Sequence, residues 1–495
     1  MEKLNLDIFD LILDHIQSFT RFGILAPYVS VCRSWQLAIE ARTMCRIYRD
    51  HQDDLETFSK IFSAAPSHRH RRRALRDLYF ATCLPTMSLT PEDHERNNTC
   101  FQDSIIKLLN ELGSWDSETP GAGPVRHGSL RLTLRWRTGH DSISNPTDVD
   151  WPPADAFLTM PDGFLNEVAN VKVISQLEIF VLQGSAPHPR ALCQLASKMT
   201  SLEHLELELW EPPLSEGAMR TEHHQALGTG ILDFKDSLPN LSSLTLKHKN
   251  HQYFRNHSFE CPSMTDEHGV DQLSRALRKL GKAGKLGKLK IQGLYISSDL
   301  FCERESGSAE SKEQATYSTW PSLRFLDIRT GLVAANGQWL CTGNRDIEPN
   351  SPSSSSEDSE DSQQSPIYDR RAESPTPAEH AISNAWRRAL DTTIFDPFVE
   401  DMVRAVTECM PSIEEFGFGI SWNPPTDGEL SIYGMKSQNV KRFQSQISTD
   451  WQLPETVVEM AKDWVGPLGI VKWRRYNYRD RYTGDWNYLT ADRDT

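Results

Sequence analysis

Residue types that can do chemistry are present in this chain, but not at the spacing of a known catalytic motif. The segment 281–288 reads Gly-Lys-Ala-Gly-Lys-Leu-Gly-Lys. It lacks the Gly-x-x-x-x-Gly-Lys-Ser/Thr order that wraps a phosphate and places a hydroxyl on magnesium, so we predict a solvated turn leading into a strand. The sixteen histidines form no His-Glu-x-x-His helix, and His223 and His224 have no third metal ligand nearby in the sequence. No Gly-x-Ser-x-Gly nucleophile elbow occurs either.

The nine cysteines are odd in number and scattered, and no two form a Cys-x-x-Cys pair. This usage is typical of inert thiols in a reducing compartment rather than of a disulfide frame or a zinc site. No stretch approaches the ~18 apolar residues that cross a bilayer, and the charged start does not resemble a secretory signal. We therefore expect a cytoplasmic and/or nuclear protein with no catalytic residue, cofactor, metal or membrane partner. An active site assembled from residues distant in sequence stays open.

Two basic stretches interrupt an acidic chain. The net charge of −15 argues against a dedicated nucleic-acid binder. Residues 67–73 (Ser-His-Arg-His-Arg-Arg-Arg) lead into an apolar segment, so we predict a solvated loop there. Residues 473–479 (Trp-Arg-Arg-Tyr-Asn-Tyr-Arg) alternate aromatic and basic side chains, which suits a strand that caps a repeat domain. A platform for single-stranded RNA has the same composition and is kept as an alternative.

The first 48 residues predict three short amphipathic helices. In the first, Ile8, Leu11, Ile12 and Ile16 share one helical face, and Asp7 stands in a capping position. The second covers residues 22–29, where Pro27 favours a break or kink. The third begins at Ser34, a residue suited to the N-cap. Helices of this length cannot bury all their apolar faces against one another, so part of that surface should face a partner.

These residues resemble the F-box, a family whose pattern runs from Leu-Pro through an acidic residue and an aliphatic helix to a Val-Cys-Arg-x-Trp closure. The matching positions are Leu4, Asp7, Ile8, Leu11, Ile12, Leu25, Val31, Cys32, Arg33 and Trp35. The sequence departs from the family at Asn5, where proline is usual. The resemblance implies docking onto the Skp-family adaptor of a cullin-RING ubiquitin ligase, with adaptor contact through Leu4, Ile8, Leu11, Ile12, Leu25, Val31, Cys32 and Trp35. An ordinary three-helix cap with the same apolar stripe is the alternative.

A strand template recurs in the body of the chain: an aliphatic residue, two variable residues, an apolar residue, one variable residue and a final apolar residue. The four good copies are 202–207, 241–246, 323–328 and 413–418, and the looser copies are 177–182 and 286–291. Segments with helical periodicity lie between them, at 190–199, 270–280 and 396–410. Alternating strands and helices of this kind predict the inner strands of a leucine-rich solenoid. The alternative is an ordinary α/β domain in which the leucines form the core.

The widest gap between copies contains a polar, acidic insert at residues 344–381. Its apolar content is too small to offset the entropy of ordering it, so we predict a disordered loop. Candidate phosphorylation sites, each followed by a proline or by an acidic residue three positions on, are Ser351, Ser354, Ser355, Ser365, Ser374 and Thr376. The insert could equally be passive. A second polar stretch, 303–319, predicts another surface loop.

The expected architecture is α/β, with an N-terminal three-helix F-box and an irregular leucine-rich-repeat-like solenoid of parallel strands and crossover helices. Its expected parts are 1–48 (F-box), 49–110 (helical linker), 111–343 (repeats), 344–383 (acidic insert), 384–450 (last repeats) and 451–495 (C-terminal cap). The overall plan is similar to that of fungal F-box proteins with degenerate leucine-rich bodies. That resemblance implies a non-catalytic substrate adapter of an SCF-type ligase, which binds the Skp-family adaptor, through it a cullin, and a target protein. A protein-interaction scaffold outside any ligase remains the alternative.

Overall fold

The computed structural model describes residues 6–19, 25–49, 53–63, 65–85, 90–115, 129–138, 157–161, 163–181, 186–212, 216–249, 260–303, 315–343, 389–421, 429–437, 440–447 and 451–475. The expected α/β class is confirmed, because the main sheet has twelve strands, most of them parallel, and helices alternate with the strands along the chain. The chain divides into two compact units. The first comprises 1–213, 226–249 and 285–289, and the second comprises 214–225, 250–284 and 290–495.

The first unit begins with three helical segments: α1 (Leu6–Phe19), a 3-10 helix (Ala26–Ser30) and α2 (Arg33–Thr43). They pack around Leu13, Leu25 and Ile39. The second segment is a short 3-10 helix with Pro27 in its first turn, where a missing backbone N–H costs no helical hydrogen bond. Two expected caps are wrong. The N-cap of α2 is Cys32, not Ser34, and Asp7 lies inside α1.

The strands of the first unit are all parallel to their neighbours, from β1 to β6. Their bounds are β1 (Arg46–Arg49), β2 (Asp77–Leu84), β3 (Leu130–Thr138), β4 (Ile174–Val181), β5 (His204–Trp210) and β6 (Ser243–Lys249). The helices that connect them are α3 (Asp53–Phe62), α4 (Arg69–Ala74), α5 (Pro91–Ser114), α6 (Phe164–Glu167) and α7 (Pro189–Ser197). Helix α8 (Gly217–Phe234) and strand β7 (Lys288–Gln292) contribute residues to both units.

The second unit contains both parallel and antiparallel pairs. Strand β10 (Phe325–Thr330) pairs in parallel with β13 (Glu415–Ser421), whereas β13, β14 (Glu429–Ser437) and β15 (Val440–Ile447) pair antiparallel, and β16 (Ile470–Arg475) is parallel to β15. Its main helices are α9 (Gln272–Lys282), α10 (Thr392–Arg404), which continues into a π-helical turn (Ala405–Cys409), and α11 (Glu455–Val465). Two small antiparallel sheets join β8 (Cys302–Glu303) to β9 (Thr316–Tyr317), and β11 (Cys341–Thr342) to β12 (Ala389–Leu390).

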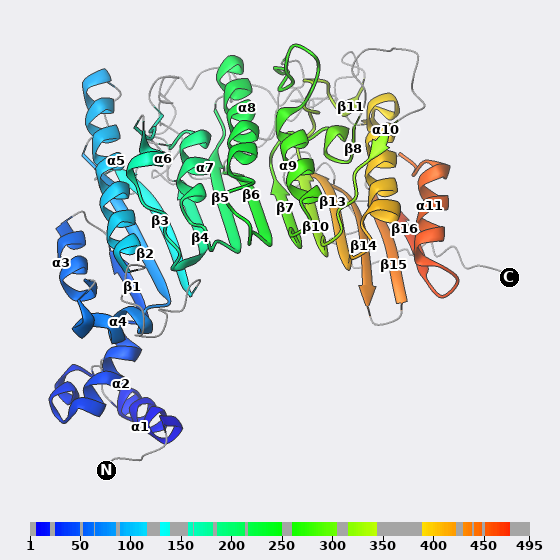
Figure 1. Ribbon diagram of the computed structural model, residues 1–495. Helices are drawn as coiled ribbons and strands as arrows, with labels where there is room; N and C mark the ends of the chain where they lie inside the picture. Colours follow the sequence, from blue (N-terminus) through cyan, green and yellow to red (C-terminus); the bar gives the residue numbers. More distant parts are fainter. Residues whose placement is uncertain are drawn as a thin grey trace, which may run out of the picture. The chain divides into compact units, whose positions relative to one another are not determined.

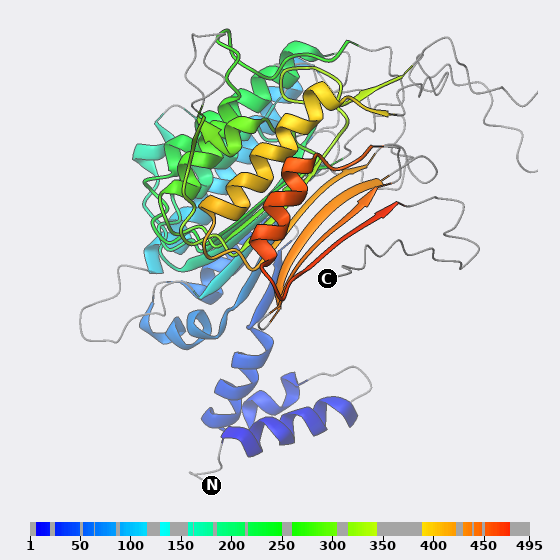
Figure 2. The same ribbon diagram turned by 90° about the vertical axis from the view of Figure 1, so that its right-hand side faces the viewer.

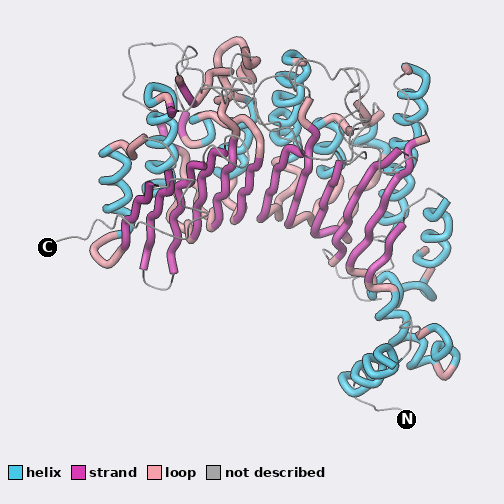
Figure 3. The backbone as a smooth tube through the Cα atoms, turned by 180° about the vertical axis from the view of Figure 1, so that it is seen from behind, coloured by secondary structure: helices cyan, strands magenta, loops and turns pink. Residues whose placement is uncertain are grey.

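Helices cover one face of the strands in each unit (Figures 1 and 2), and Figure 3 shows the strands from their other face. The leucines of the strand template alternate as expected, so that one row packs under the helices and the intervening residues face away. The inward residues Leu205, Leu207, Leu244, Leu246, Leu326, Ile328, Phe416 and Phe418 are all buried. Their burial confirms which face of the template is the core.

The basic stretch at 67–73 is not the solvated loop that its composition suggested. Residues 69–74 form helix α4, and Arg72 is 2% exposed. Its guanidinium donates to the carbonyl oxygens of Ser63 and, at 3.1 Å, of Ala65, just beyond the C-terminal end of α3. A cation is favoured there because the last carbonyls of a helix have no partner within it. This arginine therefore stabilises the fold rather than facing a ligand.

The turn expected at 281–288 is confirmed between the end of α9 at Lys282 and the start of β7 at Lys288.

Other sequence expectations lie partly or wholly outside the described residues. The stretch at 303–319 is described only at its ends, where β8 and β9 pair. Residues 344–388, which hold the acidic insert, and residues 476–495 lie outside the described ranges. Among the described helices, none combines the length and apolar character needed to cross a membrane.

Candidate functional site

The N-terminal helices leave large aliphatic side chains open to solvent beside their small core. Leu11 on α1 is 67% exposed, and Val31, which follows the 3-10 helix, is 59% exposed. Cys32 is exposed as well. Leu11 lies two residues from Leu13, which is fully buried, so α1 turns one apolar side chain inward and another outward. Apolar side chains left outside a core in this way are typical of an interaction surface.

The other residues expected to contact an adaptor occupy different environments. Leu25 is buried in the core between the helices, and the side chains of Ile12 and Trp35 are half-buried. The Trp35 ring lies against Tyr28, with ring centroids 6.1 Å apart. Ile8 lies on α1, but its side chain is not among those described, and Leu4 lies outside the described residues. All six candidate phosphorylation sites also lie outside them.

A buried carboxylate joins these helices to the rest of the first unit. Glu40 on α2 is 6% exposed and accepts hydrogen bonds from Arg71 on α4, at 2.9 Å to Nη2 and 3.1 Å to Nε. His70 and Gln36 contact the same carboxylate. The Arg71 guanidinium is the main reason that the pKa of Glu40 falls to about 2, against the opposing effect of burial. The charge pair holds α2 against α4.

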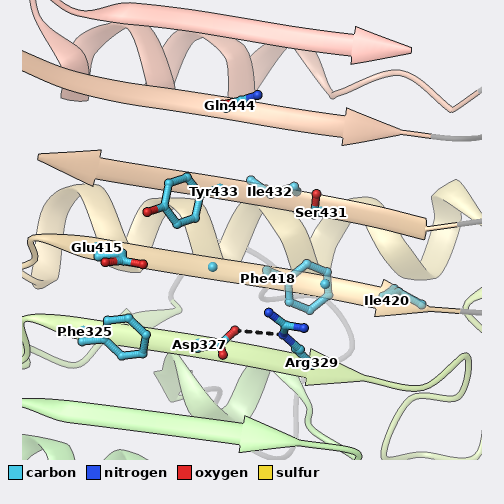
Figure 4. A pocket seen from close by; sticks show the side chains of 12 residues that line it. Phe325, Asp327, Arg329, Glu415, Phe418, Ile420, Ser431, Ile432, Tyr433 and Gln444 are labelled. Carbon is cyan, nitrogen blue, oxygen red and sulfur yellow. Dashed lines mark hydrogen bonds and ion pairs between the residues drawn. The ribbon is translucent and has the colours of Figure 1, made fainter. Parts of the chain in front are cut away.

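A second candidate site is an open pocket on the face of the second unit that its helices leave uncovered (Figure 4). It has a volume of about 480 Å³ and lies along β13. Gly417 and Gly419 form its floor, because neither has a side chain to fill the space. The flanking strands supply the walls, and the polar or aromatic wall residues are Phe325, Asp327 and Arg329 from β10, Ser431 and Tyr433 from β14, and Gln444 from β15.

Charge is distributed unevenly in this pocket. Asp327 lies 3.7 Å from the Lys290 ammonium and 3.5 Å from the Arg329 guanidinium, so two cations balance its charge. Glu415 lies beside Tyr433, at the end of the pocket away from Arg329 (Figure 4). Burial and a hydrogen bond to Glu415 raise the pKa of Tyr433, so its phenol stays protonated. These groups can bind a polar ligand, but they include no nucleophile paired with a base.

A buried cluster in the second unit contains a histidine, an aspartate and a serine, the residue types of a catalytic triad. Its hydrogen bonds stabilise the start of a helix instead. His224 Nε2 lies 2.8 Å from Asp271 Oδ1, and Ser274 Oγ contacts the other carboxylate oxygen. Asp271 is the N-cap of α9 and accepts the backbone N–H groups of Leu273 and Ser274. Burial opposes the charged form of Asp271, but the electrostatic interaction with His224 and the hydrogen bonds from His224 and Ser274 together lower its pKa. The histidine therefore supports a helix cap, and within the described residues no cluster of His, Cys, Asp and Glu could hold a metal.

No model of a known protein family matches the chain, and no curated protein sequence matches it. The alternating pattern of residues 413–418 predicts a strand with a buried face, but it does not predict the pocket on β13. The sequence does contain an indication of the pocket, because Gly417 and Gly419 occupy the outward positions of an alternating strand. Successive outward glycines indicate a strip of the sheet without side chains.

Proposed function

We propose that this chain is a substrate-recognition adapter of a cullin-RING ubiquitin ligase. Its N-terminal helices, residues 6–43, would bind a Skp-family adaptor as an F-box does. The remaining body would be a degenerate leucine-rich-repeat-like solenoid that binds a target protein. Catalysis would then come from raising the effective concentration of the target's lysines near a charged ubiquitin carrier, since the chain itself would perform no covalent step.

The observation that carries the proposal is the exposure of Leu11 and Val31 beside the core of Leu13, Leu25 and Ile39. Full burial of such a side chain stabilises a protein by about 1.5–3 kcal/mol. Leu11 and Val31 lack most of this stabilisation in the free chain, because they are exposed. Both positions belong to the pattern that resembles the F-box. A partner that covers them would recover the free energy of burial, as an apolar adaptor surface does.

The solenoid part of the proposal is supported by pairing within each unit. Strands β4, β5 and β6, which carry three copies of the template, are parallel neighbours in the first unit. Strands β10 and β13 carry two further copies and are parallel neighbours in the second. Repeated strand–helix segments that bury the same template positions are typical of leucine-rich architectures.

Charge substitution of the exposed side chains tests adaptor binding. In Leu11→Asp and Val31→Asp, a carboxylate would have to be desolvated at the interface, so binding to a purified Skp-family adaptor should fall at least about tenfold. Leu468→Asp is the matched control, because Leu468 is 78% exposed and lies outside the N-terminal helices. It should bind as the wild type does. Circular dichroism of all three variants should show an unchanged fold.

Two results would separate the proposal from its alternatives. Adaptor binding that survives both Leu11→Asp and Val31→Asp would overturn the F-box assignment. Adaptor binding without cullin co-purification would instead favour a scaffold that does not enter a ligase. An affinity purification with and without a proteasome inhibitor measures both the cullin and the captured target in one experiment.

A further inference from the structure

The pocket on β13 has room for side-chain atoms above its two glycines. A Cβ atom added at Gly417 would lie 3.4 Å from Asp327 Oδ1 and 3.9 Å from Tyr433 Cδ2, both ordinary contact distances. At Gly419 the nearest atoms would be Leu430 O at 3.6 Å and Arg329 Cγ at 3.9 Å. The strip over the two glycines is therefore open, and side-chain atoms of another molecule can lie where β13 has none.

The walls near Gly417 include an aromatic ring from each flanking strand. Phe325 is paired in register with Glu415 on one side, and Tyr433 is paired with Gly417 on the other. Both rings are half-buried, and Figure 4 shows them on opposite sides of β13. Aromatic faces attract a cation and also cover the methylene groups that carry it.

The charges of the pocket favour a cationic ligand at this end. Asp327 is already balanced by Lys290 and Arg329, whereas Glu415 forms no ion pair with any described residue. The Glu415 carboxylate accepts a hydrogen bond from the phenol of Tyr433, which does not balance its charge. A half-buried carboxylate next to two rings is the arrangement that a guanidinium or ammonium group satisfies by a charge-assisted hydrogen bond.

We propose that this pocket binds one arginine or lysine side chain from an extended segment of the target protein. The aliphatic stem lies over Gly417 between Phe325 and Tyr433, and the cation contacts the Glu415 carboxylate. Arg329 at the opposite end repels a second basic residue and so fixes the direction of the segment. This inference rests on the target-binding half of the proposed function and names the chemistry that the target must present.

Selection from a random octapeptide library displayed on phage, with the full chain immobilised, tests the pocket directly. The wild type should enrich peptides with arginine or lysine at one fixed position. A synthetic peptide of the enriched sequence should lose at least about tenfold in affinity when that residue becomes citrulline or norleucine. Glu415→Gln, which removes the charge at constant size, should cause a similar loss.

Two further variants make the test specific to the pocket. Glu414→Gln is the matched control for Glu415→Gln, since Glu414 is the preceding residue and pairs with Arg324 on the exposed surface. It should bind the peptide like the wild type. Gly417→Leu should fill the pocket and abolish binding, with the fold checked by circular dichroism, because its Cβ has room.

Three outcomes would overturn the inference. The first is enrichment of acidic peptides whose binding depends on Arg329, which would make the pocket an anion site. The second is enrichment that is unchanged in Gly417→Leu, and the third is basic-peptide binding that is unchanged in Glu415→Gln. Adaptor binding, measured separately with Leu11→Asp, distinguishes these results from failure of the ligase proposal, because the two tests alter different residues and different partners.

Discussion

Glu40 is the single residue whose charge most clearly stabilises the N-terminal helices. Its pKa is about 2 in the folded chain, against 4.5 for an unperturbed glutamate. A depressed carboxylate pKa stabilises the fold above the unfolded value and loses that contribution as the pH falls. We therefore expect Glu40→Gln to destabilise the contact between α2 and α4 by about 2–3 kcal/mol at pH 7. The difference from the wild type should shrink as the pH falls from about 4.5 toward 2. Hydrogen exchange in α2 and α4 of the full chain measures it.

The matched control at the residue scale is Glu56→Gln. Glu56 also lies 2.7 Å from a cation, Lys60, but both side chains are more than 70% exposed. Water and salt screen such a pair, so its removal should change exchange protection little at any pH. Equal effects of Glu40→Gln and Glu56→Gln would show that burial of the Glu40 carboxylate is not the source of its stabilising effect.

Two glycines on neighbouring strands give a prediction at the scale of elements. A Cβ on Gly434 of β14 would lie 2.0 Å from the buried Phe416 ring of β13, whereas a Cβ on Gly417 would meet nothing closer than 3.4 Å. Gly434→Ala must displace the ring, and overpacking of this kind typically destabilises by about 1–3 kcal/mol or more. Gly417→Ala should be neutral or slightly stabilising. Urea denaturation of both variants compares them, and equal midpoints would contradict the tight pairing of β13 with β14.

Elements with strong apolar periodicity could be predicted from the sequence. The aliphatic template marked β5, β6, β10 and β13 because each alternates buried and outward residues. Strands β14 and β15 were missed. Their inward positions include Gly434 and Ser445, which interrupt the aliphatic pattern. Antiparallel strands also need only a short connection, so no helix separates them. The helix at 69–74 was missed because its burial depends on Arg72 reaching carbonyls near the end of another helix, which no local pattern encodes.

The candidate sites were predictable only in part. Helical periodicity places Leu11 on an apolar face, yet periodicity does not tell whether the chain itself covers that face. The 67% exposure of Leu11 depends on the tertiary packing of the helices. The pocket is a stronger case, since Asp327, Gly417 and Tyr433 become neighbours only through the pairing of β10, β13 and β14. Residues this far apart in sequence form no motif.

At the scale of the whole molecule, our two proposals place adaptor binding and target binding in different parts of the chain. Leu11 and Val31 belong to the first unit, and Glu415 and Gly417 belong to the second. Each set of variants is therefore a control for the other. An adapter should keep peptide binding in Leu11→Asp and keep adaptor binding in Glu415→Gln, but it should lose target ubiquitination in both.

Deleting part of the acidic insert tests whether the stability of the fold depends on this segment. The residues that bracket it are paired, Cys341 with Leu390 and Thr342 with Ala389, so the ends of the segment are already held together. The composition of residues 350–377 predicts no packed core, and closure entropy varies slowly with loop length. Deleting 350–377 should therefore leave Tm unchanged or raise it by about one degree. Leu390→Asp, at a buried position of β12, should lower Tm and serves as the sensitivity control in the same calorimetric experiment. A fall of several degrees on deletion would mean that the insert packs against the second unit, and phosphorylation at Ser351 or Ser365 would then act on stability as well as on charge.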